Sequence, residues 1–482
     1  MKRVVKLRVT NLVWLVVGSL VLLWTISVPL LASPDEPANF VKSAAIVRGE
    51  LTGEDVAPEM LKSYWTTIVK IDPQFGSVNG LPWCFAPYPD KPACTYDVAT
   101  APQVDGVAWT NMGKYPPLGF AITGMGTIFG PTNLSVYAAR VVQAVVCGAL
   151  LGCGAVALRR RGRSLAGLVV AVTPGTLFLA ATSSPSGLEI VASIALWATT
   201  AQLLRGESSR LERLLFGVAG VLVIGTRPLG LVFYATILGI GLLITRCSVV
   251  NGARLIGRHI LLLHSAVACF MVWWYVAVYG PATRTKIDFG DTPLSIDRQL
   301  DAIVRGLPRI FEQYIGNFGW LDTPAPGVVV WAGLGLIAVS AALAWRLLDW
   351  RVWTSILLLI AAAIAFVVLA DLNYYQLLRT FGSQGRHVAP FLVGVPLLLG
   401  ERIPRGSLAS LGIYCVSAAM VTWSFVVMIR RYSVGVTAGN FSQMWNDPPW
   451  VSPLGVTGSF LAIGAASVAA VAVLYRDERH VR

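Results

Sequence analysis

The sequence places two adjacent carboxylates where its first long apolar run ends. They are Asp35 and Glu36, and Pro34 and Pro37 flank them. Acidic side chains at the end of a membrane span are costly, so they usually have a partner or a chemical task. The prolines stop the preceding helix from continuing through the pair. A carboxylate here can take a proton from a hydroxyl group. The alternative is that the pair caps the helix that follows, since acids are favoured at both positions.

Basic side chains occur at the ends of several other apolar runs, on the same predicted side. Arginine and lysine bind phosphate and stabilise its charge as it leaves. Carboxylates and cations together suit transfer of a group from a phosphate-bearing lipid; in an inverting sugar transfer, the base and the leaving group lie on opposite faces of the sugar. We therefore predict catalytic roles for Asp35 and Glu36. Contact with the donor phosphate is predicted for Arg140, Arg386, Arg227, Lys114 and His387.

The sequence establishes no cofactor. It contains neither a P-loop nor a dinucleotide-binding fingerprint. Only four histidines are present, which disfavours a histidine-rich metal site. A divalent ion held by Asp35 or Glu36 would be bound through oxygen atoms, with no characteristic residue spacing. A metal ion at these two carboxylates therefore remains an open alternative.

The elements that must position these side chains are membrane spans. The chain has 482 residues, of which 55% are hydrophobic and 13% charged. Repeated long apolar runs of this kind indicate an all-α polytopic membrane protein. We predict one integral membrane domain over residues 1–482, with outer loops at 33–132, 280–326, 371–387 and 430–453. Twelve spans are predicted, at 12–32, 133–158, 164–182, 187–204, 213–226, 229–245, 259–279, 327–345, 352–370, 388–400, 407–429 and 454–475.

The charge distribution orients these spans. The net charge is +13, and just over half of the 38 Lys and Arg residues fall in or beside the predicted inner segments, with only six of the 25 acids. An excess of Lys and Arg in cytoplasmic loops is the usual rule for membrane proteins, so the charge does not indicate nucleic-acid binding. Both termini are predicted to be cytoplasmic. Residues 1–32 are predicted to form an uncleaved span. Residues 116–130 are predicted not to cross, because crossing would put the basic segment 159–163 outside.

Two outer segments have helical periodicity. Residues 38–51 and 300–315 are each predicted to form an amphipathic helix on the outer membrane surface, the two together walling a cavity. Cys84 and Cys94 share the first outer loop. They pair in a disulfide if that loop faces an oxidising compartment, and two free thiols are the alternative.

Five segments, in this order, resemble the bacterial membrane-protein family known as domain of unknown function 2142. They are residues 34–37, 115–118, 184–188, 318–322 and 384–386. The chain also resembles the wider GT-C class of lipid-sugar-dependent glycosyltransferases, which includes protein mannosyltransferases and aminoarabinose transferases. The resemblance implies a GT-C-like bundle of about twelve transmembrane helices with juxtamembrane helices in the outer loops. In that class the first-loop acid is the usual catalytic base, which implies this role for Asp35 and, by position, phosphate contact for Arg140.

We therefore expect an inverting GT-C-type glycosyltransferase in the bacterial cell (plasma) membrane, with its active site facing outside. It would move a sugar from a polyprenyl-phosphate donor to a glycan, lipid or protein acceptor of the cell envelope, as in cell wall biosynthesis. The alternative is a transporter or flippase of a lipid-linked saccharide. Transporters place charged residues at mid-span and often contain internal repeats. Here ionisable residues cluster at the outer ends and no repeat is evident, which favours an enzyme.

Overall fold

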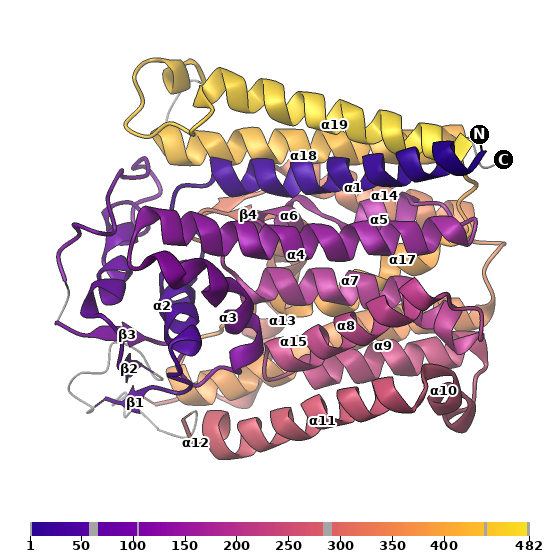
Figure 1. Ribbon diagram of the computed structural model, residues 1–482, viewed down its shortest axis with the longest axis horizontal. Helices are drawn as coiled ribbons and strands as arrows, with labels where there is room; N and C mark the ends of the chain where they lie inside the picture. The colour runs from indigo at the N-terminus through magenta and orange to yellow at the C-terminus, as the bar shows by residue number, and fades with distance from the viewer. Residues whose placement is uncertain (1, 57–65, 104–105, 283–291, 438–440, 480–482) are drawn as a thin grey trace.

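The computed structural model describes residues 2–56, 66–103, 106–282, 292–437 and 441–479, with side chains from Leu12 onward. Long helices lie side by side along the longest axis of the molecule (Figure 1). Both chain ends lie at one end of this bundle, and short strands and helices gather at the other. The apolar runs thus form helices that pack lengthwise, as the sequence predicts.

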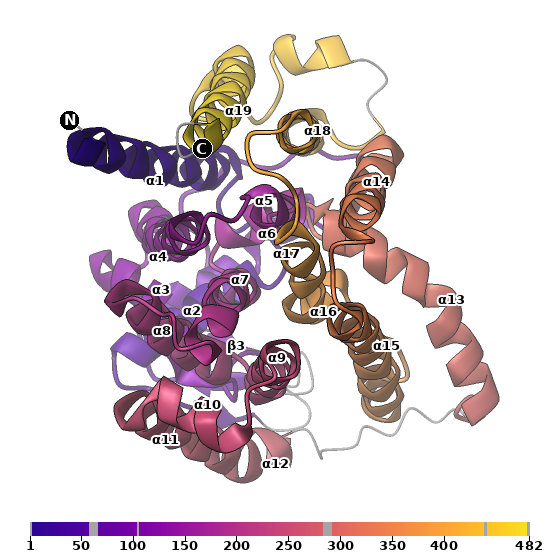
Figure 2. The ribbon, with the colours of Figure 1, turned by 90° about the vertical axis from the view of Figure 1, so that its right-hand side faces the viewer.

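Most of the bundle is made of helices longer than 15 residues. They are α1 (Lys2–Ser27), α4 (Asn133–Arg160), α7 (Pro185–Leu204), α8 (Arg210–Thr226), α9 (Gly230–Thr245), α11 (Arg258–Trp274), α13 (Ile296–Ile315), α14 (Gly327–Ala344), α15 (Trp350–Leu378), α18 (Leu408–Val434) and α19 (Gly455–Arg479). Shorter ones are α2 (Glu36–Val47), α3 (Pro117–Gly124), α5 (Ala166–Ala171), α6 (Pro174–Ala180), α10 (Val249–Ile256), α12 (Gly280–Ala282), α16 (Gly385–Leu392) and α17 (Gly394–Gly400). Helix α7 is central and buried along its apolar length, whereas α11, α14 and α19 lie at the periphery (Figure 2).

Seven of these helices are long and apolar enough to cross a membrane, or eight if the bent pair α9 and α10 counts as one span. This count covers only the described residues, and the predicted twelve is not confirmed by it. The difference lies in helices that are short or interrupted. The predicted span 164–182 is divided between α5 and α6, and the predicted span 388–400 between α16 and α17. Proline begins α6 and lies inside both α16 and α17, where it removes a backbone donor.

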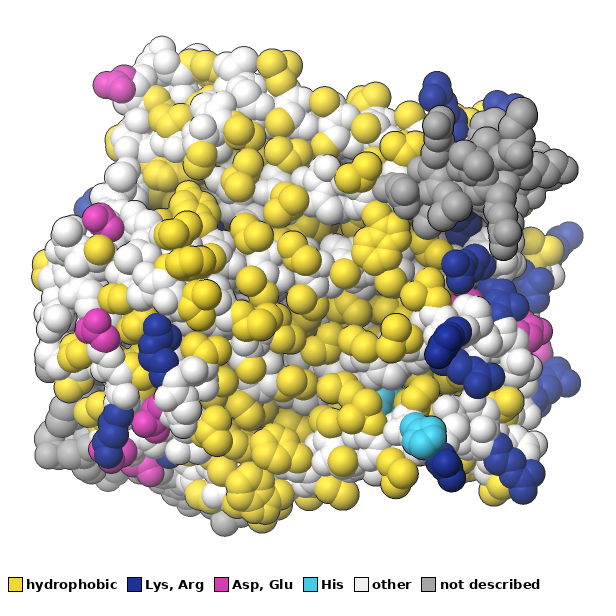
Figure 3. Space-filling view, viewed as in Figure 1, with side chains coloured by type: hydrophobic (Ala, Val, Ile, Leu, Met, Phe, Trp, Pro, Cys, Tyr) yellow, Lys and Arg dark blue, Asp and Glu magenta, His cyan; other side chains and the backbone are white. Residues whose placement is uncertain are grey.

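The kinds of side chain on the surface differ along the length of the bundle. Apolar side chains cover its middle, and Lys and Arg side chains gather mainly at the end where the termini lie (Figure 3). Acidic side chains on this face are more frequent at the opposite end. An asymmetry of Lys and Arg between the two ends of a helical bundle is common in membrane proteins. We call the end with the termini the basic end, and the other the loop end.

At the loop end, a small sheet and two helices close the bundle. Strands β1 (Glu54–Asp55), β2 (Thr67–Val69) and β3 (Ala108–Thr110) form an antiparallel sheet in that order, with Ile68 opposite Trp109. Helix α3 continues into a 3₁₀ turn at Met125–Phe129, and the two are too short to count among the spans above. Residues 116–130 thus form a compact apolar element beside α2, α4 and α8.

Helix α2 corresponds to the predicted helix at 38–51, but its predicted position on the membrane surface is wrong. All residues from Glu36 to Ala45 are buried. The polar positions of its outer face have found distant partners: Ser43 bonds Thr123, and the ammonium of Lys42 donates to the carbonyl oxygens of Gly113 (2.6 Å) and Leu51. An amphipathic pattern shows that a helix has two faces, and here the polar face meets protein rather than water.

The second predicted outer helix is α13. Its strong amphipathic pattern buries Ile303, Ile310 and Tyr314, and Pro308 lies within it. It packs on α15 and α16. The prediction that 300–315 walls a cavity with 38–51 is wrong for the 340 Å³ cavity described below, because α13 contributes no residue to it; α13 instead packs behind α15 and α16, which do. Nearby, β4 (Asn317–Phe318) pairs with β5 (Thr323–Pro324).

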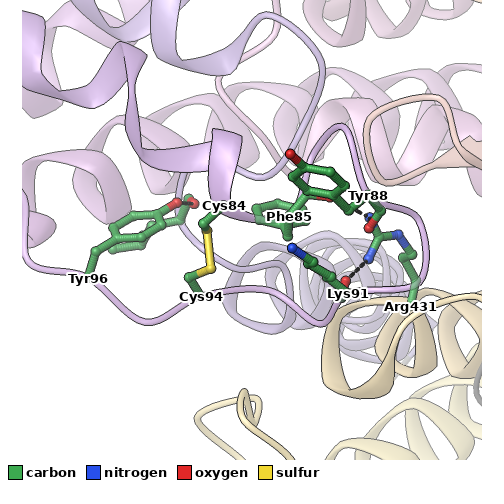
Figure 4. Close-up of a disulfide and its surroundings, with 8 residues drawn as sticks. Cys84, Phe85, Tyr88, Lys91, Cys94, Tyr96 and Arg431 are labelled. Carbon is green, nitrogen blue, oxygen red and sulfur yellow. Dashed lines mark hydrogen bonds between the residues drawn. A yellow bond between two sulfur atoms is a disulfide. The ribbon is translucent and has the colours of Figure 1, made fainter.

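A disulfide joins Cys84 to Cys94, which resolves the alternative that the sequence left open. The ring that it closes docks on the end of α18 (Figure 4). Arg431 donates to the carbonyl oxygens of Phe85, Tyr88 and Lys91. Its Nε also lies 2.7 Å from the carboxylate of Asp322, so this buried cation is fully engaged in holding the loop.

Candidate functional site

A cavity of about 340 Å³ lies at the loop end of the bundle. Polar residues of the first outer loop, the start of α7 and the start of α16 form part of its wall. Apolar residues of α9 and α15 form another part, including Phe233, Phe366 and Leu377, with Leu229 just before α9. A site with both kinds of wall suits a ligand that is part polar and part lipid.

Asp35 and Arg386 meet in this cavity although 351 positions separate them in sequence. A guanidinium nitrogen of Arg386 lies 2.6 Å from Oδ2 of Asp35. The Asp35 side chain is 34% exposed and that of Arg386 is 11% exposed. Asp35 adopts a left-handed backbone conformation, φ 62°, and its side chain makes no cap to α2. The carboxylate is therefore turned away from the helix that it precedes and faces the cavity.

The position of Arg386 depends on close backbone packing. A Cβ atom on Gly385 would lie 2.2 Å from the backbone nitrogen of Tyr314, so only glycine lets α16 approach α13 this closely. The preceding turn is held by Asp371, whose carboxylate accepts from the backbone N–H groups of Gly382 (2.9 Å) and Ser383 (2.8 Å). Arg386 is thus delivered to the cavity by a braced segment.

Glu36, the neighbour of Asp35, faces the protein interior. Its two carboxylate oxygens each lie 2.6 Å from a guanidinium nitrogen of Arg140, and both side chains are fully buried. Arg140 also donates to the carbonyl oxygens of Val28 and Pro29, each at 2.7 Å, and Glu36 accepts from the backbone N–H of Ser183. This pair ties the end of α1, the start of α2 and α4 together. Neither residue lines the cavity.

A second acid–arginine pair lines the cavity. Arg227 follows α8, and its guanidinium lies 3.4 Å from Oε2 of Glu189 and 3.3 Å from the hydroxyl of Ser186. Arg227 is 19% exposed, whereas Glu189 is completely buried. The break between α8 and α9, where Pro228 follows Arg227, places this cation at the cavity rather than within a continuous span.

His387 and Lys114 are placed differently. His387 lines the cavity, and its Nδ1 accepts from the backbone N–H of Gln384, which leaves the other ring nitrogen to act as a donor. Lys114 lies outside the cavity lining and pairs with Asp55 at 2.9 Å. Of the five predicted phosphate ligands, the structure therefore brings Arg386, Arg227 and His387 together.

A metal ion fits these residues poorly. Among the described residues, no group of three or more His, Cys, Asp or Glu side chains could share an ion. The two carboxylates predicted as alternative ion ligands face opposite ways, and each is paired with an arginine. We derive no chemical step through a metal here.

The family model described as "Predicted membrane protein (DUF2142)" matches residues 19–395. The chain belongs to this family. It is a membrane protein, as the family description and its apolar helices agree.

No curated protein matches the chain. Among solved structures, the fold is similar to that of ArnT from Cupriavidus metallidurans in the apo state. The sequences are 13% identical, the match covers 96% of this chain and 76% of that chain, and the TM-score is 0.47. A likeness at this level assigns no role to any residue of this family member.

Sequence reasoning missed several residues of the cavity. Asp371 lies just beyond an apolar run, and its backbone contacts have no sequence signature. Glu189 follows the motif at 184–188, and its position one helical turn after Pro185 was the available signal. Tyr115, Tyr279 and other aromatic residues also line the cavity, with those two rings edge-to-face at 5.4 Å. Such contacts depend on which helices become neighbours.

Proposed function

We propose that this family member is a GT-C-type glycosyltransferase that moves a sugar from a polyprenyl-phosphate donor to a cell-envelope glycan, lipid or protein. The observation that carries the proposal is the cavity in which Asp35 and Arg386 meet beside apolar walls from α9 and α15. A carboxylate, two arginines and a lipid-compatible wall are the parts that such a transfer needs. The loop end would face outside, because the basic end suits the cytoplasm.

The chemical step assigned to Asp35 is proton removal. The acceptor hydroxyl oxygen forms a bond to the anomeric carbon of the sugar, and the bond from that carbon to the phosphate oxygen breaks with its electron pair going to the phosphate. The hydroxyl proton passes to Asp35. A base and a leaving group on opposite faces of the sugar would invert the configuration at the anomeric carbon.

The proposed phosphate contacts are Arg386 and Arg227, with His387 as an additional donor. In Arg386 the Nη2 atom is bonded to Asp35, whereas its buried Nε has no partner among the described residues. A phosphate that engages this guanidinium would compete with Asp35 for it and free the carboxylate to accept a proton. Planar guanidinium groups suit such two-point contacts with phosphate oxygens.

Glu36, Arg140 and Lys114 are not assigned a catalytic or phosphate-binding role in this proposal. The guanidinium of Arg140 is surrounded by Glu36 and backbone carbonyl groups, and neither side chain is exposed. Lys114 is paired with Asp55, and neither residue lines the cavity. We assign these residues the task of holding the first outer loop in place, where it presents Asp35.

The test uses the purified full chain in vesicles that contain a synthetic polyprenyl-phosphate hexose, with cell-envelope glycan as acceptor. Release of polyprenyl phosphate should depend on the protein and on Asp35, and the Asp35→Asn variant should bind polyprenyl phosphate without releasing sugar. Normal release by correctly folded Asp35→Asn protein would reject Asp35 as the base. Movement of the intact saccharide lipid between leaflets, without release, would instead favour the flippase alternative.

A further inference from the structure

Glu189 is a second carboxylate in the cavity, and the transfer step does not use it. It lies in the second turn of α7 and is completely buried. Its Oε2 faces Arg227 at 3.4 Å, while its Oε1 has no hydrogen-bond partner among the described residues. A buried carboxylate oxygen without a donor is costly, so its presence beside a cavity indicates a ligand that supplies one.

Other polar atoms at the cavity share this condition. They include Oδ1 of Asn111, the hydroxyl oxygens of Ser184 and Ser383, and Nε of Arg386. The Glu189 and Asn111 oxygens can only accept, the two hydroxyls can do either, and only the arginine nitrogen must donate. The cavity therefore suits a ligand with several hydroxyl or amino donors.

The charged side chains of the cavity wall further restrict the kind of ligand that the cavity can bind. Asp35, Glu189 and Asp371 contribute three carboxylates, whereas Arg386 and Arg227 contribute two guanidinium groups. Both arginines are already paired with acids. A phosphodiester can share these guanidinium groups, but a carboxylate on the sugar would add a fourth acid to a wall that has two arginines.

We propose that Glu189, held by Arg227, binds a hydroxyl or amino group of the donor sugar, and that the cavity thereby selects sugars without a carboxylate over uronic acids. The inference rests on the proposed function, because it names the class of sugar that the same site takes. The aromatic side chains of Tyr115 and Tyr279 in the same wall suit the C–H face of such a sugar.

The experiment compares three probes in vesicles: polyprenyl phosphate alone, polyprenyl-phosphate glucose and polyprenyl-phosphate glucuronic acid. The wild-type protein should bind the glucose lipid more tightly than the glucuronic acid lipid. Glu189→Gln should reduce that preference by about tenfold or more, because it removes a carboxylate that repels the carboxylate of glucuronic acid. Binding of polyprenyl phosphate alone should not fall, because the variant removes a negative charge beside Arg227 and leaves that guanidinium able to contact the phosphate.

Glu212→Gln is the matched control. Glu212 is also a buried glutamate beside an arginine, Arg161 at 3.3 Å, but it lies at the start of α8 near the basic end. Its substitution should leave the sugar preference unchanged. A folded Glu189→Gln protein with the wild-type preference would overturn the inference. If no variant or wild-type protein binds any probe, the proposed function fails instead.

A second variant decides the matter if Glu189→Gln does not fold. Asn111→Asp keeps the shape of the side chain and adds a carboxylate at an atom that already accepts. The preference for glucose over glucuronic acid should rise in this variant. An unchanged or lower preference in folded Asn111→Asp protein would contradict selection by cavity charge.

Discussion

Asp35 and Glu36 are neighbours of the same chemical kind, yet the structure puts them in opposite environments. The Glu36 carboxylate meets Arg140 in two hydrogen bonds of 2.6 Å, with neither side chain exposed. The Asp35 carboxylate accepts one hydrogen bond from Arg386 at the edge of a cavity, and the Asp35 side chain is 34% exposed. The left-handed backbone at Asp35 separates the two directions.

This difference teaches how an acid–arginine pair should be interpreted. Around Arg140 every nitrogen has an acceptor, so the pair is closed and can only hold the structure together. At Arg386 and Glu189, one polar atom of each side chain lacks a partner among the described residues, so these pairs are open to a ligand. Open pairs around a shared cavity indicate a site, whereas a closed pair indicates a support.

The largest expected effect is the loss of the closed pair. Glu36→Ala or Arg140→Ala leaves one buried charge without its partner, which should lower the free energy of unfolding by about 3–5 kcal/mol. Thermal unfolding in detergent measures this. The double variant Glu36→Leu with Arg140→Met is the control, because it removes both charges and should recover much of the stability. Single variants as stable as the wild type would contradict the structural role of the Glu36–Arg140 pair.

Substitution in the open pair of Asp35 and Arg386 should lower the transfer activity rather than the stability of the protein. Asp35→Asn removes the proton acceptor but retains a residue that tolerates the left-handed conformation. Sugar transfer should fall by about 10²- to 10⁴-fold, the usual contribution of a general base. The unfolding temperature should stay close to that of the wild type. A large loss of stability with parallel loss of activity would mean that Asp35, like Glu36, only supports the fold.

A smaller effect separates charge from geometry at the open pair. Arg386→Lys keeps the positive charge but loses the planar fork, so affinity for polyprenyl phosphate should fall by about tenfold. Equilibrium binding to vesicles that carry polyprenyl phosphate measures this change. Arg305→Lys is the matched control, because Arg305 is exposed on α13 and pairs with Asp301. Equal affinities of the two variants would remove Arg386 from the phosphate site.

The smallest effect concerns Lys42. Its buried ammonium donates to backbone carbonyl oxygens and forms no salt bridge with an acid among the described residues. Burial of Lys42, and then its neighbour Lys114, lower the pKa of Lys42 from 10.5 to about 7. Between these values the unfolded chain binds more protons than the folded one, so stability should rise with pH from about 7 toward 10.5. We expect the unfolding temperature to rise by a few degrees between pH 7 and pH 8.5. Lys42→Met should flatten this part of the pH profile, and an unchanged slope in that variant would contradict the assignment.

The long helices could be predicted from sequence because an apolar run must satisfy its own backbone in a membrane. The location of α2 could not be predicted. Its apolar and polar periodicity is the same whether the polar face meets water or protein, and here Lys42 and Ser43 find partners 71 and 80 positions away. Local sequence determines that a helix forms, while distant contacts determine what covers it.

The sequence predicted which residues contribute to the site, but not which of them form pairs. Asp35, Arg386, Arg227 and His387 lie at the ends of predicted apolar runs, which is why the sequence indicates them, and all four line the cavity. The sequence treated Glu36 as equivalent to Asp35, since only the backbone angle at the junction sends them apart. Pairings over 104 positions for Glu36 and 351 for Asp35 have no local signal.

The disulfide ring has a consequence for the order of assembly. Cys84 and Cys94 are ten positions apart, whereas Arg431 follows Lys91 by 340 positions. The ring is therefore synthesised, and able to close, long before α18 leaves the ribosome. When α18 arrives, its guanidinium meets three carbonyl oxygens that a short closed loop already holds in place. A late-made helix of the bundle is in this way bound by a loop that was closed early in synthesis.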